Sequence, residues 1–376
     1  MNRGETSAYG AAGVDYGTLD AGKRSALSEA LATSALLARR GGEAIDASRG
    51  EPAFVFELAG QTFAFVLEGL GTKSMIARAA QEQLGMDAFD AVAYDTVAAV
   101  VNDLSCVGAL PLVVNAYFAT GSSQWYRDEP RQAALLTGWR EGCEVAGATW
   151  GGGESPALPG LVAEAEIELA GCAIGVVPDA RGAILGERLQ DGDEIVIVAS
   201  SGLHANGSSL ARMIAEKLPA GYATKLPSGR AFGEALLDRS VIYVPFVEAL
   251  LERGLPVHYL SHITGHGLLK LMRPRREVSY RLHTLPPVPE VLAFLAARAQ
   301  LSPRAAYSTL NMGCGFAVYC ASGAGHEVVR AANALGLRAE VAGAVEAGPR
   351  RVILEPVDVT FESSELDLGP QSRADE

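Results

Sequence analysis

The chain has 376 residues, of which 49% are hydrophobic, and a formal net charge of −13. This length predicts two domains with sizeable cores, and the negative charge argues against binding of nucleic acid or of an anionic membrane surface. The five cysteines are scattered and form no Cys-x-x-Cys pair, which is typical of buried thiols in a reducing compartment.

Two features predict a cytoplasmic protein. The N-terminus lacks the basic, apolar and cleavable regions of a signal peptide. The longest apolar stretch, around residues 91–118, is interrupted by Asp95, Asn102 and Asp103, so it cannot be a membrane span of ~20 apolar residues.

The first half of the chain predicts a mixture of helices and strands. Residues 1–20 are polar and glycine-rich and are expected to form a flexible arm. The apolar periodicity that follows predicts helices over 20–40, 89–108 and 131–146, and strands over 53–58, 62–68, 112–119 and 167–177.

The second half continues in the same style after the turn Asp191-Gly192-Asp193, the expected domain junction. It predicts strands over 194–199, 315–320 and 351–355, and helices over 208–217, 241–253, 267–272, 288–299 and 325–335. We therefore predict an α/β (α+β) fold with an N-terminal domain over 1–180, a C-terminal domain over 190–360 and a disordered acidic tail over 361–376.

A glycine-containing turn follows the strand over 62–68. Its two glycines, Gly69 and Gly71, would let the backbone approach a phosphate closely, and Thr72 and Lys73 offer a hydroxyl and a cation. Glu68 could hold a metal ion. The spacing fails the Walker A pattern because Thr72 separates glycine from lysine, and a simple turn with a solvated lysine is an equal alternative.

Polar side chains interrupt the apolar helix over 89–108. Asp95 and Asn102 share one face of this helix, and Asp103 lies ~12 Å of helix rise beyond Asp95. No Lys or Arg occurs between Arg78 and Arg127, so metal ions are suitable partners for buried carboxylates here. The alternative is a polar strip that faces solvent.

Three further segments combine glycine with polar groups. Gly151–Gly153 precede Glu154, which predicts either a loop that presents a carboxylate or a flexible turn. Residues 200–209 contain His204 between a strand and a helix, which suits anion binding as well as simple helix capping. Residues 262–267 carry two histidines four positions apart; their glycines favour an anion-binding loop over a zinc site.

Taken in order, these segments resemble the aminoimidazole ribonucleotide synthetase family. Eight short motifs carry the resemblance. In the first half, residues 12–15 are similar to the family's Ala-Gly-Val-Asp, 68–73 to Asp-Gly-Val-Gly-Thr-Lys, 101–104 to Val-Asn-Asp-Leu, 118–121 to Tyr-Ala-Thr-Gly and 152–155 to Gly-Gly-Glu-Thr. In the second half, residues 200–207 are similar to Ser-Ser-Gly-x-His-x-Asn-Gly, 262–267 to His-Ile-Thr-Gly-Gly-Gly and 311–315 to Asn-x-Gly-x-Gly. The resemblance covers roughly residues 8–356, and eight motifs in family order are hard to reach by chance.

The resemblance implies an ATP-dependent cyclo-ligase of purine biosynthesis that acts on a small-molecule ribonucleotide and dimerises through its N-terminal sheet. It implies that four acidic residues hold Mg²⁺: Glu68, Asp95, Asp103 and Glu154. It implies that ATP phosphates contact Gly69, Gly71, Thr72, Lys73, Asn102, Gly152 and Gly153. Substrate would face Ser201, His204, Asn206, Thr264 and Gly265, with Lys73 and His204 as catalytic residues and His204 moving a proton.

The sequence also departs from this pattern. Only Gly41-Gly42 remain of a longer glycine loop after the first helix, Asn115 stands in place of an aspartate, and His266 replaces a glycine. Residues 156–158 replace an Ala-Glu-Met segment, so a carboxylate is lost there. These departures leave open a related ATP-using enzyme with another substrate, or a non-catalytic nucleotide-binding homologue.

Overall fold

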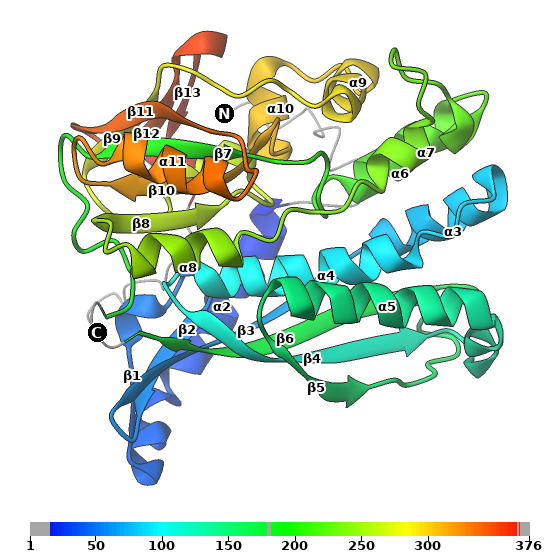
Figure 1. Cartoon of the computed structure of the whole chain (residues 1–376), viewed down its shortest axis with the longest axis horizontal. Coiled ribbons are helices and arrows are strands. Elements are labelled where there is room, and N and C mark those ends of the chain that lie inside the picture. Colours follow the sequence, from blue (N-terminus) through cyan, green and yellow to red (C-terminus); the bar gives the residue numbers. More distant parts are fainter. Residues whose placement is uncertain (1–15, 179–181, 367, 369–376) are drawn as a thin grey trace.

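Two sheets, each with its own helices, divide the chain into halves (Figure 1). The computed structural model describes residues 16–178, 182–366 and 368. The motif at residues 12–15 therefore lies outside the described residues.

The N-terminal half contains a six-stranded sheet of order β1-β2-β3-β6-β4-β5. Its strands are β1 (Gly42–Ala44), β2 (Phe54–Leu58), β3 (Gln61–Gly69), β4 (Leu110–Thr120), β5 (Thr149–Glu154) and β6 (Ile167–Val177). Its helices are α2 (Tyr16–Leu31), η1 (Ser34–Arg40), η2 (Asp46–Ser48), α3 (Lys73–Leu84), α4 (Phe89–Ser105), η3 (Ser123–Arg127) and α5 (Glu129–Val145).

Helix α4 is the centre of this half because its Ala- and Val-rich sequence is buried nearly all round. It packs against β3 and β6 of the sheet and lies alongside α5 (Figure 1). The α4–α5 approach requires Gly138, since a Cβ at this position would lie 1.9 Å from the carbonyl oxygen of Asp90. This close packing fixes which face of α4 points toward the second half.

The C-terminal half contains a seven-stranded sheet of order β13-β12-β9-β11-β7-β10-β8. Its strands are β7 (Glu194–Ala199), β8 (Val257–His262), β9 (Val278–Leu282), β10 (Cys314–Cys320), β11 (Ala339–Ala347), β12 (Arg351–Leu354) and β13 (Val359–Glu362). Its helices are α6 (Ser208–Lys217), η4 (Gly221–Ala223), α7 (Phe232–Leu236), α8 (Val244–Glu252), η5 (Gly267–Met272), α9 (Glu290–Arg298), α10 (Pro303–Thr309), α11 (Gly325–Ala334), η6 (Glu355–Val357) and η7 (Ser363–Glu365).

The predicted α/β fold with two domains is confirmed, with differences at several elements. Residues 16–20, expected in the flexible arm, already belong to α2, and the expected helix over 20–40 is divided into α2 and η1. The expected helix over 267–272 is the 3₁₀ helix η5. Residues 361–366, expected in the disordered tail, form the end of β13 and η7, where Phe361 and Leu366 are buried.

Candidate functional site

A polar cavity of about 410 Å³ lies where the two halves meet. The N-terminal half contributes α2, residues 50–52, the end of β3 and one face of α4; the C-terminal half contributes the loops after β7 and β8 and the helix η5. Six of the residues predicted from sequence line it together: Glu68, Gly69, Asp103, Asn206, Thr264 and Gly265.

Two acids of the cavity lining interact with each other: Glu68, at the end of β3, and Asp103, on α4. Burial and the neighbouring negative charge of Asp103 raise the pKa of Glu68 to about 7. Burial opposes ionisation of Asp103 as well, but the hydrogen bond and charge of His262, with Lys270 and Arg273, lower its pKa to about 2. Near neutral pH, Asp103 is therefore ionised, whereas Glu68 exchanges its proton readily.

Basic residues of the lining lie beside these acids. His262 Nδ1 donates to the ionised Asp103 Oδ1 at 2.6 Å, and Lys270, on η5, donates through Nζ to Thr264 Oγ1. Burial and the charge of Arg273 lower the pKa of Lys270 to about 8, against the opposing effect of Asp103 and Glu68. Anionic groups of a ligand would thus meet cations held close to a pair of acids.

Helix α2 forms one wall of the cavity and is fixed there by His266. This residue stands where the resembling family has glycine, and its backbone is left-handed with φ of 69°. Its Nε2 lies 2.9 Å from Asp20 Oδ2 on α2. Lys23 and Arg24 of the same helix also line the cavity, so the histidine brings two more cations to the site.

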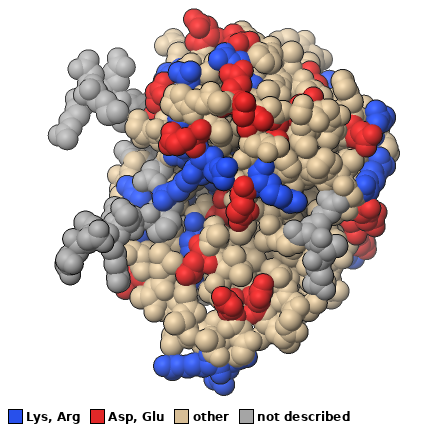
Figure 2. Space-filling view, turned by 90° about the vertical axis from the view of Figure 1, so that its left-hand side faces the viewer, with Lys and Arg blue, Asp and Glu red and all other residues tan. Residues whose placement is uncertain are grey.

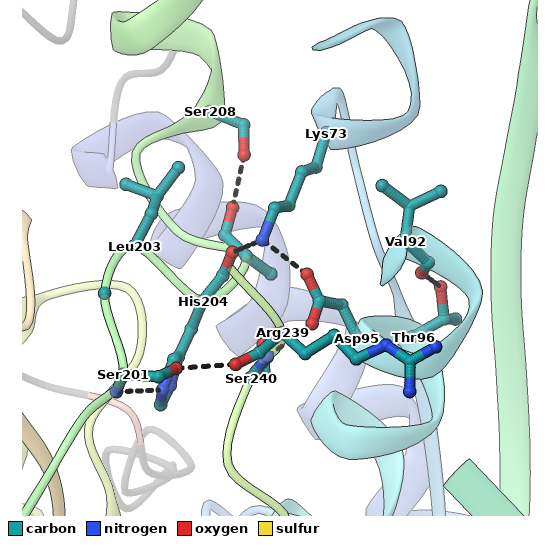
Figure 3. A network of polar contacts seen from close by, with 12 residues as sticks. Lys73, Val92, Asp95, Thr96, Ser201, Leu203, His204, Ser208, Arg239 and Ser240 are labelled. Atoms are coloured by element: carbon teal, nitrogen blue, oxygen red, sulfur yellow. Dashed lines mark hydrogen bonds and ion pairs between the residues drawn. The ribbon is translucent and has the colours of Figure 1, made fainter. Parts of the chain in front are cut away.

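Lys73 and Asp95 form a separate pair outside the cavity lining (Figure 3). Both side chains are fully buried; Lys73 Nζ contacts Asp95 Oδ2 and donates to the carbonyl oxygen of His204 at 2.6 Å. The backbone N–H of Ser240 donates to Asp95 Oδ1 at 2.6 Å. The expectation that Asp95 lacks a basic partner was wrong, because Lys73 supplies the cation. Metal binding by Asp95 and phosphate binding by Lys73 stay predictions.

His204 is also buried rather than exposed to the cavity. Its Nε2 accepts a hydrogen bond from the backbone N–H of Ser201 at 3.3 Å. Burial, with the charges of His262 and Lys73, lowers its pKa well below the usual range. The ring is therefore neutral and contacts the loop after β7, outside the cavity lining. Its predicted role in moving a proton stays a prediction.

Other predicted ligands connect the two halves instead. Asn102 donates to the carbonyl oxygen of Val241 at 2.8 Å and accepts from the backbone N–H of Tyr243 at 2.7 Å. The hydroxyls of Thr72 and Ser209 lie 3.1 Å apart. By contrast, the Ser201 hydroxyl donates to the carbonyl oxygen of Arg239 at 2.6 Å within the C-terminal half, and Gly71 does not line the cavity.

Glu154 lies apart from the other predicted metal ligands. It ends the edge strand β5, is exposed, and does not line the cavity. Gly153 allows the close pairing of β5 with β4, because a Cβ at this position would lie 2.2 Å from the carbonyl oxygen of Ala116. Of the four predicted metal ligands, only Glu68 and Asp103 meet, and no group of three or more His, Cys, Asp or Glu able to hold a metal is found among the described residues.

Sequence reasoning missed six further charged residues of the cavity lining: Asp20, Lys23, Arg24, Glu51, Lys270 and Arg273. Lys270 gave a usable signal, because it interrupts the apolar run Leu268–Met272 directly after the 262–267 segment. Asp20 and Lys23 gave none, since nothing in the sequence indicates that α2 packs against residues more than 200 positions later.

Family comparisons agree with this arrangement of two halves. The N-terminal domain of AIR synthase related proteins matches residues 50–177, and the C-terminal domain of the same proteins matches residues 190–355. The chain therefore belongs to the AIR synthase related family, and the resemblance predicted from its motifs is confirmed.

The particular relatives are more specific. Phosphoribosylformylglycinamidine cyclo-ligase of Anaeromyxobacter dehalogenans (strain 2CP-1) is 37% identical over 285 residues, which cover 75% of this chain and 79% of that protein. The protein of the same name from Methanothermobacter thermautotrophicus is 35% identical over 309 residues, 81% of this chain and 86% of that protein.

Solved structures share the fold at lower identity. Hydrogenase maturation protein HypE has a TM-score of 0.61 at 17% identity, covering 85% of this chain and 92% of that chain. T. maritima PurL complexed with FGAR has a TM-score of 0.58 at 17% identity, covering 87% of this chain and 49% of that chain. Among the described residues of this chain, no helix is long and apolar enough to cross a membrane.

Proposed function

We propose that this protein is an ATP-dependent cyclo-ligase that converts formylglycinamidine ribonucleotide to aminoimidazole ribonucleotide, with release of ADP and phosphate. The observation that carries the proposal is the cavity at the junction of the halves, where Glu68 and Asp103 face Lys270 and Arg273. Relatives named for this reaction, at 35–37% identity over most of the chain, give the substrate.

The acid pair fits a divalent cation. Glu68 and Asp103 lie close enough for one to raise the pKa of the other, and a Mg²⁺ ion would relieve this repulsion. Mg²⁺ is usually bound by one or two carboxylates, with water and substrate phosphates completing its shell. Glu68 and Asp103 would hold it, and the ion would neutralise charge on the transferred phosphoryl group.

The basic residues of the cavity suit the phosphates of ATP. Lys23 and Arg24 on α2, with Lys270 and Arg273, supply cations from two elements far apart in sequence, and Gly69 and Gly265 supply backbone at the same cavity. Phosphoryl transfer depends mainly on positioning and charge stabilisation. These residues would orient the γ-phosphate toward the formyl-amide oxygen of the substrate.

The reaction forms one C–N bond. The γ-phosphoryl group moves to the formyl-amide oxygen, an amidine nitrogen attacks the activated carbon, and phosphate leaves with that oxygen. Asn206 and Thr264 line the cavity and would orient the substrate. Lys270, with a pKa of about 8, can donate a proton to the departing phosphate and regain one from the cyclising nitrogen near neutral pH.

The direct test incubates purified protein with ATP, Mg²⁺ and formylglycinamidine ribonucleotide and follows ADP and aminoimidazole ribonucleotide. Formation of both in equal amounts is expected. ADP formation only with a different small molecule would assign the chain to a related enzyme. No ADP with any such compound, despite ATP binding in calorimetry, would indicate a nucleotide-binding protein without this activity.

We also propose a homodimer formed through the six-stranded sheet. Helices α4 and α5 cover one face of this sheet (Figure 1), whereas Phe65, Leu67, Leu112 and Tyr117 are exposed on its strands β3 and β4. Exposed apolar patches of this kind mark interaction surfaces. Leu67→Lys should give a monomer in analytical ultracentrifugation, whereas Leu161→Lys, at an exposed leucine outside the strands, should not.

The proposed activity suits the cytoplasm. All five cysteines are free thiols, as expected in a reducing compartment where ATP is available. Fractionation of cells that express the full chain would test this location.

A further inference from the structure

The chain continues beyond the segment that matches the family's C-terminal domain, which ends at residue 355. Strand β13, the helix η7 and the buried Leu366 all lie after this point. Leu368 follows them and lines the large cavity of the candidate site. A segment outside the matched domain therefore supplies part of the wall of this site.

Leu368 lies where the candidate site meets a second cavity. The second cavity has a volume of about 230 Å³. It shares four lining residues with the large cavity: Gly50, Glu51, Arg273 and Leu368. Of these four, Leu368 has the apolar side chain, and it is partly buried and packs against the main hydrophobic core. Leu368 is thus an apolar contact at the junction of two cavities that charged residues line.

The segment that leads to Leu368 is well packed. Strand β13 pairs with β12 in an antiparallel register that places Phe361 opposite Val352. Phe361 and Leu366 are both buried, and the guanidinium group of Arg304 lies 5.0 Å from the centre of the Phe361 ring. Burial of a large apolar side chain contributes about 1.5–3 kcal/mol, so these two residues hold the segment firmly.

Arg350 connects this segment to the helix η5. Its Nη2 donates to the carbonyl oxygen of Leu366 at 3.1 Å, and its Nε donates to that of Met272 at 2.8 Å. Met272 ends η5, which brings Lys270 to the cavity. One guanidinium group therefore fixes the backbone two residues before Leu368 relative to a helix of the candidate site.

Water is the main competitor of a substrate in a site of this kind. Lys, Arg, Asp and Glu side chains border a hollow across the middle of one side of the molecule (Figure 2), and charged residues line both cavities. Enzymes exclude water from sites where reactive intermediates form, because water would hydrolyse them. An apolar side chain between the two cavities is suitably placed to exclude it.

We propose that Leu368 excludes water from the candidate active site, and that Arg350 is a positioning residue for the segment that carries it. The proposal rests on the proposed cyclo-ligase function for its reaction. Water in the site could take the γ-phosphoryl group of ATP directly. It could also attack the activated carbon, so that phosphate leaves and the formyl amide is restored. Either route consumes ATP without closing the imidazole ring.

The test measures ADP and aminoimidazole ribonucleotide together in Leu368→Asn. Asparagine keeps a branched side chain but ends it in an amide that binds water. The parent should form the two products in equal amounts. The variant should form ADP in at least about twofold excess, because hydrolysis then competes with ring closure. Leu368→Met keeps an apolar side chain of similar volume and should behave as the parent does. The control is Leu335→Asn, an exposed leucine that lines neither cavity.

Arg350→Met tests the positioning role. It removes the hydrogen bonds to Leu366 and Met272 and should raise the ratio of ADP to aminoimidazole ribonucleotide as Leu368→Asn does. The double variant should add little to either single change, because both act at the same place. A loss of stability alone would lower the amount of active protein without changing this ratio. Arg330→Met, at an exposed arginine paired with Glu327, is the control.

Three results would overturn the proposal. Equal amounts of the two products in Leu368→Asn would show that Leu368 does not exclude water. An ADP excess of the same size in Leu335→Asn would show that the effect is not specific to the wall of the site. An ADP excess in Leu368→Asn but not in Arg350→Met would remove the positioning role of Arg350.

A failure of the proposed function gives a different result, because the parent would then form no aminoimidazole ribonucleotide. Hydrogen exchange tests the wall without the reaction. The backbone amides of residues 50–52 and 266–273, which border the cavity, should exchange about tenfold faster in Leu368→Asn and Arg350→Met than in the parent, as expected when a local contact that limits opening is lost. Leu335→Asn should exchange as the parent does. Equal exchange at these segments in all four proteins would exclude Leu368 from a closing role.

Discussion

Two aspartates on helix α4, eight residues apart, meet different surroundings. Asp95 is fully buried with Lys73 and receives a backbone hydrogen bond from Ser240. Asp103 lines a cavity beside Glu68, a second acid, and is held ionised by His262 and Lys270. One aspartate has its charge balanced within the protein, whereas the other shares its site with a carboxyl group that resists ionisation.

This difference separates structural from ligand-binding acids in the molecule. The Lys73–Asp95 pair, with the His204 carbonyl, joins α3 and α4 to the loop after β7 (Figure 3) and lies outside the cavity lining. The Glu68–Asp103 pair instead lines a cavity that can receive a ligand or a cation. Substitutions in the first pair should therefore change stability, and substitutions in the second should change ligand affinity.

The largest effect is expected from Lys73→Met. It leaves Asp95 as a buried charge without its cation, and breaking a buried pair in this way costs about 3–5 kcal/mol. Urea-induced unfolding would measure the loss. The exposed Lys217→Met is the control and should change stability by less than about 0.5 kcal/mol.

The double variant Lys73→Met with Asp95→Leu sharpens this prediction. It removes both charges and should recover most of the lost stability, because apolar replacements of a buried pair are often neutral. A Lys73→Met protein within about 1 kcal/mol of the parent would contradict the view that this pair is structural.

Asp103→Ala should have the next largest effect, on metal rather than on folding. We expect Mg²⁺-dependent ATP affinity to fall at least about 100-fold, because loss even of a group that only orients a metal ligand costs about 10–100-fold. Isothermal calorimetry with and without Mg²⁺ would measure it, with the exposed Glu164→Gln as control. Unchanged ATP affinity would remove Asp103 from the site.

The sequence predicted the fold better than it predicted the pairing of charges. Helix α4 and the strands around it follow from local patterns, because a long Ala/Val run and alternating apolar residues bury themselves in few ways. The Lys73–Asp95 contact joins residues 22 positions apart on different helices. No local pattern indicates that the lysine turns inward, so both acids on α4 were predicted to bind metal.

The cavity lining also contains residues that local sequence patterns could not predict. Glu68 and Asp103 were predicted to share a site because both occur in segments typical of the family. Lys270 and the α2 residues Asp20 and Lys23 were missed, since they reach the cavity only after the halves pack together. Contacts between distant segments depend on how the sheets and helices assemble, which periodicity does not encode.

The third prediction concerns the pH dependence of stability at Glu68. Its pKa is raised from 4.5 to about 7 by burial and by Asp103, so the folded state holds this proton more tightly than the unfolded state. The stabilisation is therefore complete below pH 4.5 and is lost as the pH rises through about 7. Glu68→Gln has no carboxyl group to titrate and should not show this loss. Its free energy of unfolding, measured relative to that of the parent, should therefore rise by about 2 kcal/mol between pH 5 and pH 8.

Thermal unfolding at both pH values would measure this difference, with the exposed Glu57→Gln as control. Addition of Mg²⁺ at pH 8 should raise the melting temperature of the parent and have little effect on Glu68→Gln, because only the parent retains both carboxylates. Parallel pH profiles for the parent and Glu68→Gln would show that Glu68 does not hold the exchanged proton.

The smallest effect is expected from Thr72→Val, adjacent to the structural lysine. Its hydroxyl lies 3.1 Å from that of Ser209 on α6, so the variant loses one hydrogen bond between the halves, worth about 1 kcal/mol. ATP affinity should stay within about twofold, because Thr72 does not line the cavity. Ser209→Ala should cost a similar amount, and the double variant should cost little more than either single change. A tenfold loss of ATP affinity in Thr72→Val but not in Ser209→Ala would instead show that the Thr72 hydroxyl contacts phosphate. Thr72 would then belong to the ligand site around Glu68 and Asp103 and not to the structural region around Lys73 and Asp95.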